Sequence, residues 1–394
     1  MKILLVIDSI GVGGAEHSTA AMMPLLRARG HDVRAATLYD AGFGDEERLR
    51  ASGLEVRPLT SRHFLGRVRE LRSRIRAEQP DIVHTALFAS DMVGRVAACG
   101  TKTKIVSSLV NTTYDAARGA DPNVHRWKLN AVQLVDALTG QMLVDRFHAV
   151  SEGVAEVNAR DLHLPRTRIG VVQRGRSRDR LGVWSPDRRA SARKALGVSP
   201  DTKVVLTIGR QEHQKAHVDL VAAIAALGRT VPDLKVFVAG REGNASAQLH
   251  AALLRHPEAA KVIELLGHRH DVADLLCAAD VLAIPSLYEG TAGAALEAMS
   301  LRCPVVCTDL AGVRGVLVDD HNALLVPVGD AAAMAAALAK VLAHPPTADR
   351  LRESGLGDFD QRFTIEVAAA AMECFYVEVL AGGSRPKDAD VVDR

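Results

Sequence analysis

Two glutamates flank a glycine-containing segment that follows a short apolar run. In the stretch YEGTAGAALEAMS, Glu289 and Glu297 stand eight positions apart where a helix is expected to begin. The backbone amides at a helix N-terminus attract anions, so two acids at this place need a different kind of partner. Carboxylates accept hydrogen bonds from vicinal hydroxyl groups. The pattern therefore favours a nucleotide sugar, with its phosphate on the amides and hydroxyls on the acids. Two acids that only complement the helix dipole are the alternative.

Basic side chains follow a second apolar run, in GRQEHQKAH. Arg210 can bind oxygens bidentately and Lys215 is a compact point charge, so together they could neutralise a diphosphate. Solvated surface cations are the alternative. His213 and His217 have the spacing of zinc ligands, but no third ligand is evident, and we expect no metal. The loop LGHRHDV contains Arg269, which we place near a base or phosphate, or in an ordinary polar turn.

A glycine-rich turn, IGVGGAEHS, follows the first apolar run. Gly11, Gly13 and Gly14 allow a phosphate to approach the backbone where a helix begins. A dinucleotide fingerprint would require glycine at position 16, and this residue is Glu16. Asp40 ends the next apolar run and could hold a ribose, so a variant dehydrogenase remains an alternative.

Short apolar runs alternate with helical stretches along the whole chain, which predicts parallel α/β sheets. The runs are KILLVI, DVRAATL, DIVHTAL, KIVSSLV, RFHAVS and RIGVVQ, then KVVLTIGR, KVFVAG, VIELLG, VLAIPS, PVVCTD and ALLVPV. The chain has 394 residues, more than the roughly 250 to 300 that one core supports. We predict two facing Rossmann-like domains, with the site in a deep cleft between them at the carboxyl ends of the strands.

The predicted boundaries follow changes in composition. We assign an N-terminal domain to 1–175, a polar, arginine-rich linker region to 176–200 and a C-terminal domain to 201–362. A last amphipathic helix is expected over 363–381, and the polar tail over 382–394 is predicted to be disordered.

Charge and hydropathy exclude several classes of protein. Lys plus Arg (49) nearly balance Asp plus Glu (47), so no basic field for nucleic acid is present. No run of 18 or more apolar residues occurs, and the apolar start lacks the features of a signal peptide, so we expect a cytoplasmic protein. The arginine-rich stretch FLGRVRELRSRIRAEQ could contact an anionic membrane at its inner face through an apolar stripe. Packing of that stripe on the sheet is the alternative.

With these residues the chain resembles the retaining glycosyltransferases of family 4, which have the GT-B fold. The most specific match is the E-x7-E motif, here Glu289 to Glu297 with the helix and strand that follow. Weaker matches are GGAE at 13–16, DIVHTALF around His84, FHAVSEGV around Ser151 and GRQEHQK at 209–215.

The resemblance implies a role for each matched position. Glu297 would bind the nucleotide ribose, Glu289 the donor sugar, and Arg210 and Lys215 the leaving diphosphate. Further donor contacts would come from Gly13, Gly14, Arg269, Gly290, Thr291, Ala292 and Gly293. The last helix would cross back onto the N-terminal domain. The reaction would need no protein nucleophile, metal or cofactor. It would move a hexosyl or N-acetylhexosaminyl group from a UDP- or GDP-sugar to a hydroxyl of a glycan, a lipid-linked glycan or a natural product.

Three positions depart from the family pattern. Thr291 and Ala292 replace the aromatic residue and second glycine of E-G-F-G, and Val110 stands where relatives often have histidine before Asn111. The usual P-N-G-V-D reads QRGRS from Gln173. We keep His84 and Asn111 as candidates for the acceptor or sugar pocket. A nucleotide-sugar epimerase or phosphorylase of the same fold and a non-catalytic nucleotide- or sugar-binding protein remain alternatives.

Overall fold

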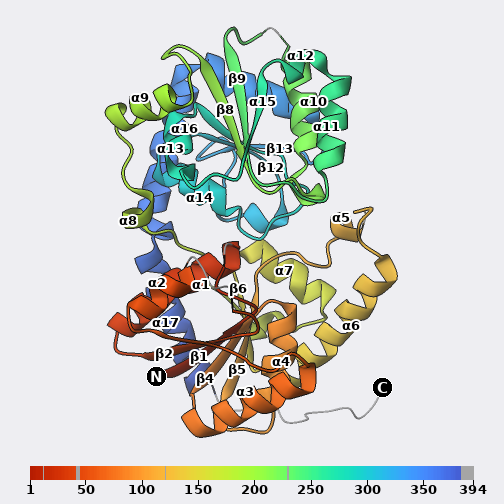
Figure 1. Ribbon diagram of the computed structural model, residues 1–394, viewed down its shortest axis with the longest axis vertical. Helices are drawn as coiled ribbons and strands as arrows, with labels where there is room; N and C mark the ends of the chain where they lie inside the picture. Colours follow the sequence, from red (N-terminus) through yellow and green to blue (C-terminus); the bar gives the residue numbers. More distant parts are fainter. Residues whose placement is uncertain (12, 41–44, 120, 229, 383–394) are drawn as a thin grey trace.

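The computed structural model contains two α/β units, one above the other in Figure 1. It describes residues 1–11, 13–40, 45–119, 121–228 and 230–382. The loops after strands of the two sheets meet, because Gly290 lies against the carbonyl oxygen of Val110 and Gly153 against that of Ala311. The structure confirms the predicted pair of facing parallel α/β domains.

The N-terminal sheet has seven parallel strands in the order β3-β2-β1-β4-β5-β6-β7. Helices cover both faces, so the central strands are buried on both sides. β1 has a continuous apolar sequence, whereas β4 and β5 also bury histidine, threonine and serine. The strands are β1 (Lys2–Ile7), β2 (Asp32–Thr37), β3 (Glu55–Pro58), β4 (Ile82–Ala86), β5 (Lys104–Leu109), β6 (Arg146–Ala149) and β7 (Ile169–Val171). The helices are α1 (Gly14–Ala28), α2 (Asp45–Ala51), α3 (Phe64–Glu78), α4 (Phe88–Ala98), α5 (Ala116–Gly119), α6 (Arg126–Leu143), α7 (Glu152–Asp161) and the short η1 (Arg166–Arg168).

The C-terminal sheet has six parallel strands in the order β10-β9-β8-β11-β12-β13. They are β8 (Lys203–Ile208), β9 (Leu234–Ala239), β10 (Ile263–Gly267), β11 (Val281–Ile284), β12 (Val305–Thr308) and β13 (Leu324–Val326). The helices are α8 (Arg178–Leu181), α9 (Pro186–Ala195), α10 (His217–Leu227), α11 (Ser246–Arg255), α12 (Pro257–Ala260), α13 (Val272–Ala278), α14 (Gly293–Ser300), α15 (Ala331–Ala343) and α16 (Pro345–Asp358). Short turns of helix are η2 (His213–Lys215), η3 (Ala311–Val313) and η4 (Phe359–Phe363).

The chain passes between the two units twice, and the two crossing segments pair with each other. The backbone amide of Arg176 donates to the carbonyl of Phe363 at 2.9 Å, and that of Ile365 donates to the carbonyl of Arg176 at 3.0 Å. The helix α17 (Ile365–Ala381) then packs on the N-terminal unit, into whose core it places Met372, Phe375, Tyr376 and Val379. The tail predicted over 382–394 lies, apart from Gly382, outside the described residues. The predicted boundaries stay predictions.

The apolar stripe of α3 faces the sheet. Val68, Leu71 and Ile75 are buried in the N-terminal core, whereas Phe64 and Leu65 at the start of the helix are exposed. Packing on the sheet, the alternative to membrane contact for this stripe, is therefore what the structure shows. None of the helices described is long and apolar enough to span a bilayer.

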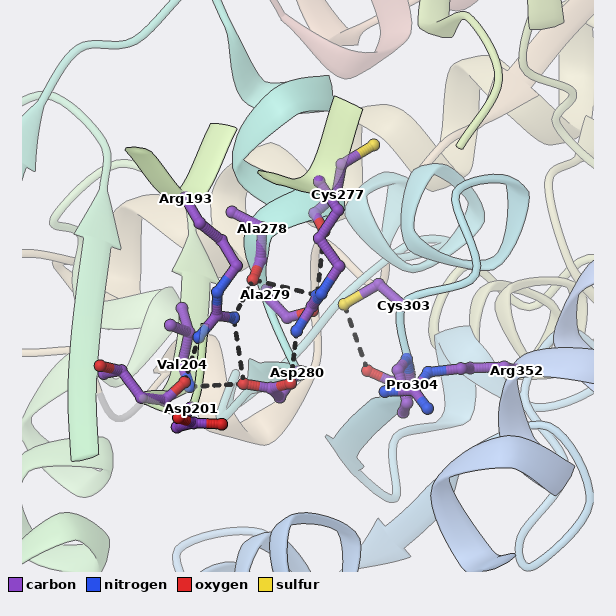
Figure 2. A network of polar contacts seen from close by, with 12 residues as sticks. Arg193, Asp201, Val204, Cys277, Ala278, Ala279, Asp280, Cys303, Pro304 and Arg352 are labelled. Atoms are coloured by element: carbon purple, nitrogen blue, oxygen red, sulfur yellow. Dashed lines mark hydrogen bonds and ion pairs between the residues drawn. The ribbon is translucent and has the colours of Figure 1, made fainter. Parts of the chain in front are cut away.

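The predicted linker region, 176–200, contains a helix that is fixed to the C-terminal sheet. From α9, the Arg189 guanidinium donates to Asp280 at 2.7 Å and the Arg193 guanidinium to the carbonyl of Ala278 at 2.8 Å. Figure 2 shows the Arg193 side chain between that carbonyl and the Asp280 carboxylate at the start of β11. Burial lowers the pKa of Arg193, so the network must supply the polar contacts that water would otherwise make.

Replacing Arg193 with alanine should therefore destabilise the C-terminal unit. We expect Arg193→Ala to lower the free energy of unfolding by about 3 kcal/mol, because the carbonyls of Ser199 and Thr202 lose the guanidinium that donates to them. The adjacent Lys194 is exposed, so Lys194→Ala should change it by less than about 0.5 kcal/mol. Denaturant unfolding followed by the fluorescence of Trp184, which packs on the C-terminal core, measures both. Equal unfolding midpoints for the two variants would contradict the role of the network.

Candidate functional site

The loop between β11 and α14 carries the two glutamates at the boundary between the units. Glu289 is buried before the helix begins at Gly293, and Glu297 follows one turn inside it. Ala292 has φ of 46°, a left-handed conformation that glycine adopts more readily, so the helix begins with local backbone strain. The buried hydroxyl of Thr291 has no hydrogen-bond partner among the described residues. A hydroxyl donor and free helix amides therefore lie together at this loop.

Lys215 and Glu289 form an ion pair across the site. The Nζ of Lys215, at the end of η2, donates to Oε1 of Glu289, and the hydroxyl of Ser286 donates to the same oxygen at 2.7 Å. Gly209 leaves room for the lysine, because a Cβ there would lie 3.1 Å from its side chain. The structure thus brings together the predicted leaving-group cation and the predicted sugar-binding acid.

The other predicted basic residues of the C-terminal unit pair with other carboxylates. Arg210 is exposed and its Nη1 contacts Oε1 of Glu212 at 2.7 Å. Arg269 pairs with Asp271, its near neighbour, at 2.8 Å. Among the described residues no group of three or more His, Cys, Asp or Glu side chains is placed to hold a metal ion.

Glu297 also has a cationic partner, which the sequence analysis did not assign. Nε of Arg176 donates to Oε1 of Glu297 at 2.8 Å, and its Nη1 lies 3.4 Å from the hydroxyl of Ser18 on α1. Its guanidinium also lies against Gly293, where any Cβ would meet it. Arg176 therefore connects the hinge with both units. The signal in the sequence was the RGRS that replaces the family's linker pattern.

Arg174, two residues earlier, lies on the N-terminal side of the site. Its Nη1 is 3.5 Å from the point where a Cβ of Gly14 would lie. It forms no hydrogen bond or ion pair with any other described residue. Burial, and to a smaller extent the charge of Arg176, lower the pKa of Arg174 to about 10, so the side chain stays cationic at neutral pH.

The predicted residues of the N-terminal unit fall into two places. Gly13 and Gly14 begin α1, and Asn111 lies beside Gly290 of the other unit, so these three border the site. His84 instead points into the interior, where its two ring nitrogens contact the hydroxyls of Tyr376 at 2.6 Å and Ser108 at 2.7 Å.

His84 is part of a buried polar chain. The hydroxyl of Ser108 also contacts Nδ1 of His148 at 2.9 Å, and the other ring nitrogen of His148 lies 3.0 Å from the carbonyl oxygen of Val172. Burial lowers the pKa of His84 well below its usual value, and lowers that of His148 to about 4. Both rings are therefore neutral at neutral pH. They line a cavity under α1 that they share with Ser18, Val110, Arg174 and Tyr376.

Comparison with known proteins follows the division of the chain into two units. A family model described as "Glycosyltransferase Family 4" matches residues 12–180, and one described as "Glycosyl transferases group 1" matches residues 188–357. A D-inositol 3-phosphate glycosyltransferase of Xylanimonas cellulosilytica is 30% identical over 312 residues, which cover 76% of this chain and 72% of the relative. The lipopolysaccharide core biosynthesis mannosyltransferase LpsB of Rhizobium meliloti is 28% identical over 200 residues, or 50% of this chain and 57% of that protein.

Solved structures share the fold. The crystal structure of Anabaena HepE in complex with UDP and glucose has a TM-score of 0.82 at 18% identity, covering 96% of this chain and 99% of that one. The lipopolysaccharide glycosyltransferase WaaG has a TM-score of 0.74 at 17% identity, covering 97% of this chain and all of its own.

The buried histidines should make the N-terminal unit sensitive to mild acid. Below about pH 6.5 the unfolded chain binds protons at both rings, whereas folded His148 does so only near pH 4. Stability is therefore lost as the pH falls, by roughly 2 kcal/mol for His148 between pH 7 and 5, and His84 acts in the same direction. In thermal melts, His148→Gln should lose less stability than the wild type over this range. His125→Gln, at an exposed position, should match the wild type. Equal pH dependence in all three proteins would contradict the assignment.

Proposed function

Because the chain belongs to glycosyltransferase family 4 and has the GT-B fold, we propose that it moves a sugar from a nucleoside-diphosphate sugar to a hydroxyl acceptor with retention of anomeric configuration. The observation that carries this proposal is the Lys215–Glu289 pair beside the free amides of α14. The Lys215 ammonium and the helix amides suit a phosphate, and the Glu289 carboxylate suits hydroxyls, so a ligand that carries both kinds of group fits the site.

Donor binding would exchange the partners of the two acids. In this structure Glu289 pairs with Lys215 and Glu297 with Arg176. Hydroxyls of the sugar and the ribose would replace the cations at the carboxylates, which frees the cations for the diphosphate. Each buried charge then keeps a partner before and after binding, which limits the desolvation cost. Thr291 would add its unpartnered hydroxyl on the sugar side.

The chemical step would depend on electrostatic stabilisation of the leaving group. As the bond between sugar and phosphate breaks, negative charge grows on the diphosphate, and Lys215 and the α14 amides are placed to stabilise it. Glu289 would be engaged with hydroxyls of the donor sugar, and a front-face route needs no protein nucleophile. We therefore assign no covalent intermediate. The leaving phosphate oxygen would take the proton of the acceptor hydroxyl on the same face of the sugar.

The donor we propose is a UDP- or GDP-hexose. The HepE structure is a complex with UDP and glucose, and LpsB is named a mannosyltransferase. The acceptor would be a glycan, a lipid-linked glycan or a small polyol. Contact with an anionic membrane, if a lipid-linked acceptor is used, stays a prediction.

Glu297 should determine nucleotide affinity. Thermal-shift measurements with UDP, GDP, ADP and dTDP select the nucleotide, since a bound ligand raises the melting temperature. Glu297→Ala should then weaken its binding about tenfold, because the ribose hydroxyls lose their acceptor. Glu378 is exposed on α17, so Glu378→Ala should bind as the wild type does. Undiminished affinity in Glu297→Ala would refute the ribose assignment.

Lys215 should act mainly on the chemical step. We expect Lys215→Met to lower kcat for release of nucleoside diphosphate about 10²- to 10³-fold, with a smaller change in KM, because the charge it neutralises grows in the transition state. Lys261 also pairs with a glutamate but is exposed, so Lys261→Met is the matched control. Interconversion of nucleotide sugars without net release of nucleotide would indicate an epimerase instead. An unchanged kcat for nucleoside diphosphate release in Lys215→Met would exclude the proposed role of Lys215.

A further inference from the structure

We propose that Arg174 forms an oxyanion-binding subsite in the acceptor half of the site, so that the acceptor carries a phosphate or carboxylate near its reacting hydroxyl. The inference rests on the proposed function, because it takes the donor side to be the C-terminal unit. It concerns a residue that occupies the position of asparagine in the family pattern.

Arg174 differs from the arginines that follow it along the chain. Arg176 pairs with Glu297, Arg178 with Asp360 and Arg180 with Asp45. Arg174 alone among these four has no carboxylate partner in the part of the chain that the structure describes. A half-buried cation without a partner loses hydration and gains no ion pair, so it lowers the stability of the fold. A residue that costs stability in the empty protein is best explained by a ligand that pairs with it.

The surroundings of Arg174 suit a small oxyanion. Nη1 of Arg174 lies beside Gly14 at the start of α1, a helix of 15 residues whose N-cap, Gly13, offers no side-chain cap. The carboxylate of Glu16 lies against Gly13 at the same helix start, and an anion bound to the first amides would take its place. Among the described residues that line the adjoining cavity, Arg174 is the only Arg, Lys, Asp or Glu. Bidentate binding by a planar guanidinium is the geometry that phosphate and carboxylate groups prefer.

The position of this cation favours the acceptor over the donor diphosphate. Arg174 follows β7 and faces α1, both parts of the N-terminal unit, whereas Lys215 and α14 belong to the C-terminal unit. Glu289 pairs with Lys215 of the C-terminal unit, and its charge also acts on Arg174 of the N-terminal side. A donor sugar bound at Glu289 would thus have the diphosphate on the Lys215 side and the Arg174 subsite on the other. A group that approaches the sugar from that side is the acceptor.

A structural explanation competes with this one. The carboxylates of Glu16 and Glu289 both act electrostatically on Arg174, so closure of the two units could bring one of them into direct contact with it. In that case Arg174 would hold the closed form together and would bind no added anion. The two explanations predict different results for phosphate binding when the donor site is already filled.

The test is a calorimetric titration of inorganic phosphate into protein saturated with the nucleoside diphosphate selected above. The nucleotide occupies the donor phosphate site, so any remaining saturable phosphate binding reports a second site. We expect Arg174→Gln to weaken this binding at least about tenfold. Arg174→Lys should weaken it less, because lysine keeps the positive charge but cannot donate two parallel hydrogen bonds as the guanidinium does. Arg69 is exposed on α3, and Arg69→Gln should bind phosphate as the wild type does. Arg174→Gln should not lower the melting temperature.

Each other result counts against the subsite in an identifiable way. Absence of saturable phosphate binding to the nucleotide-loaded wild type, or equal binding by Arg174→Gln, would overturn it and leave the proposed function intact. About tenfold weaker nucleotide binding by Arg174→Gln would move the residue to the donor side and also overturn it. If no nucleotide binds the wild type, the proposed function fails, and the acceptor assignment fails with it.

Discussion

Two carboxylates at the start of one helix must be neutralised when no ligand is present, and the arrangement of the site follows from that requirement. Glu289 is almost fully buried, so its charge would be costly without a cation beside it. Lys215 forms an ion pair with Glu289, and Arg176 forms one with Glu297. Arg176 also lies against Gly293, the first residue of the helix whose amides would bind a diphosphate. The cations that neutralise the two acids in this structure are thus the same ones proposed to bind the diphosphate of the ligand.

The same requirement connects the site with the hinge. Arg176 pairs through its backbone with the returning segment, through its side chain with Glu297 of α14, and lies within 3.4 Å of Ser18 on α1. A ligand that takes Glu297 from Arg176 removes one contact between the hinge and the C-terminal unit. Such a ligand would therefore couple its binding to the relative position of the two units through one side chain, because a conformation is favoured only by differential contacts.

The sequence was sufficient to predict the strands of both sheets, but not all of the residues that pair with one another in the site. Apolar runs of the right length predicted both sheets, because strands covered on two faces are mostly apolar. Lys215 and Glu289 were found because each follows a strand end. Arg174 and Arg176 were overlooked because an arginine-rich polar segment looks like a solvated linker, and only the fold shows that it runs between the units. His84 contacts Tyr376, which lies 292 positions away in the sequence, and a local sequence pattern cannot predict such a contact.

The departures from the family pattern make sense when they are considered together. Val110 removes a polar side chain from the strand-end loop, and Arg174 places a cation on the wall of the same cavity. The exchange replaces a neutral hydrogen-bonding contact with an electrostatic one, which acts over a longer distance in a partly buried site. Thr291 similarly offers a hydroxyl where an aromatic ring is usual. Under the proposed function, all three changes would surround the transferred sugar and its acceptor, whereas Glu297, the proposed ribose acceptor, keeps the family residue. On the proposed assignment, the departures would change what is glycosylated and leave the donor contacts as in the family.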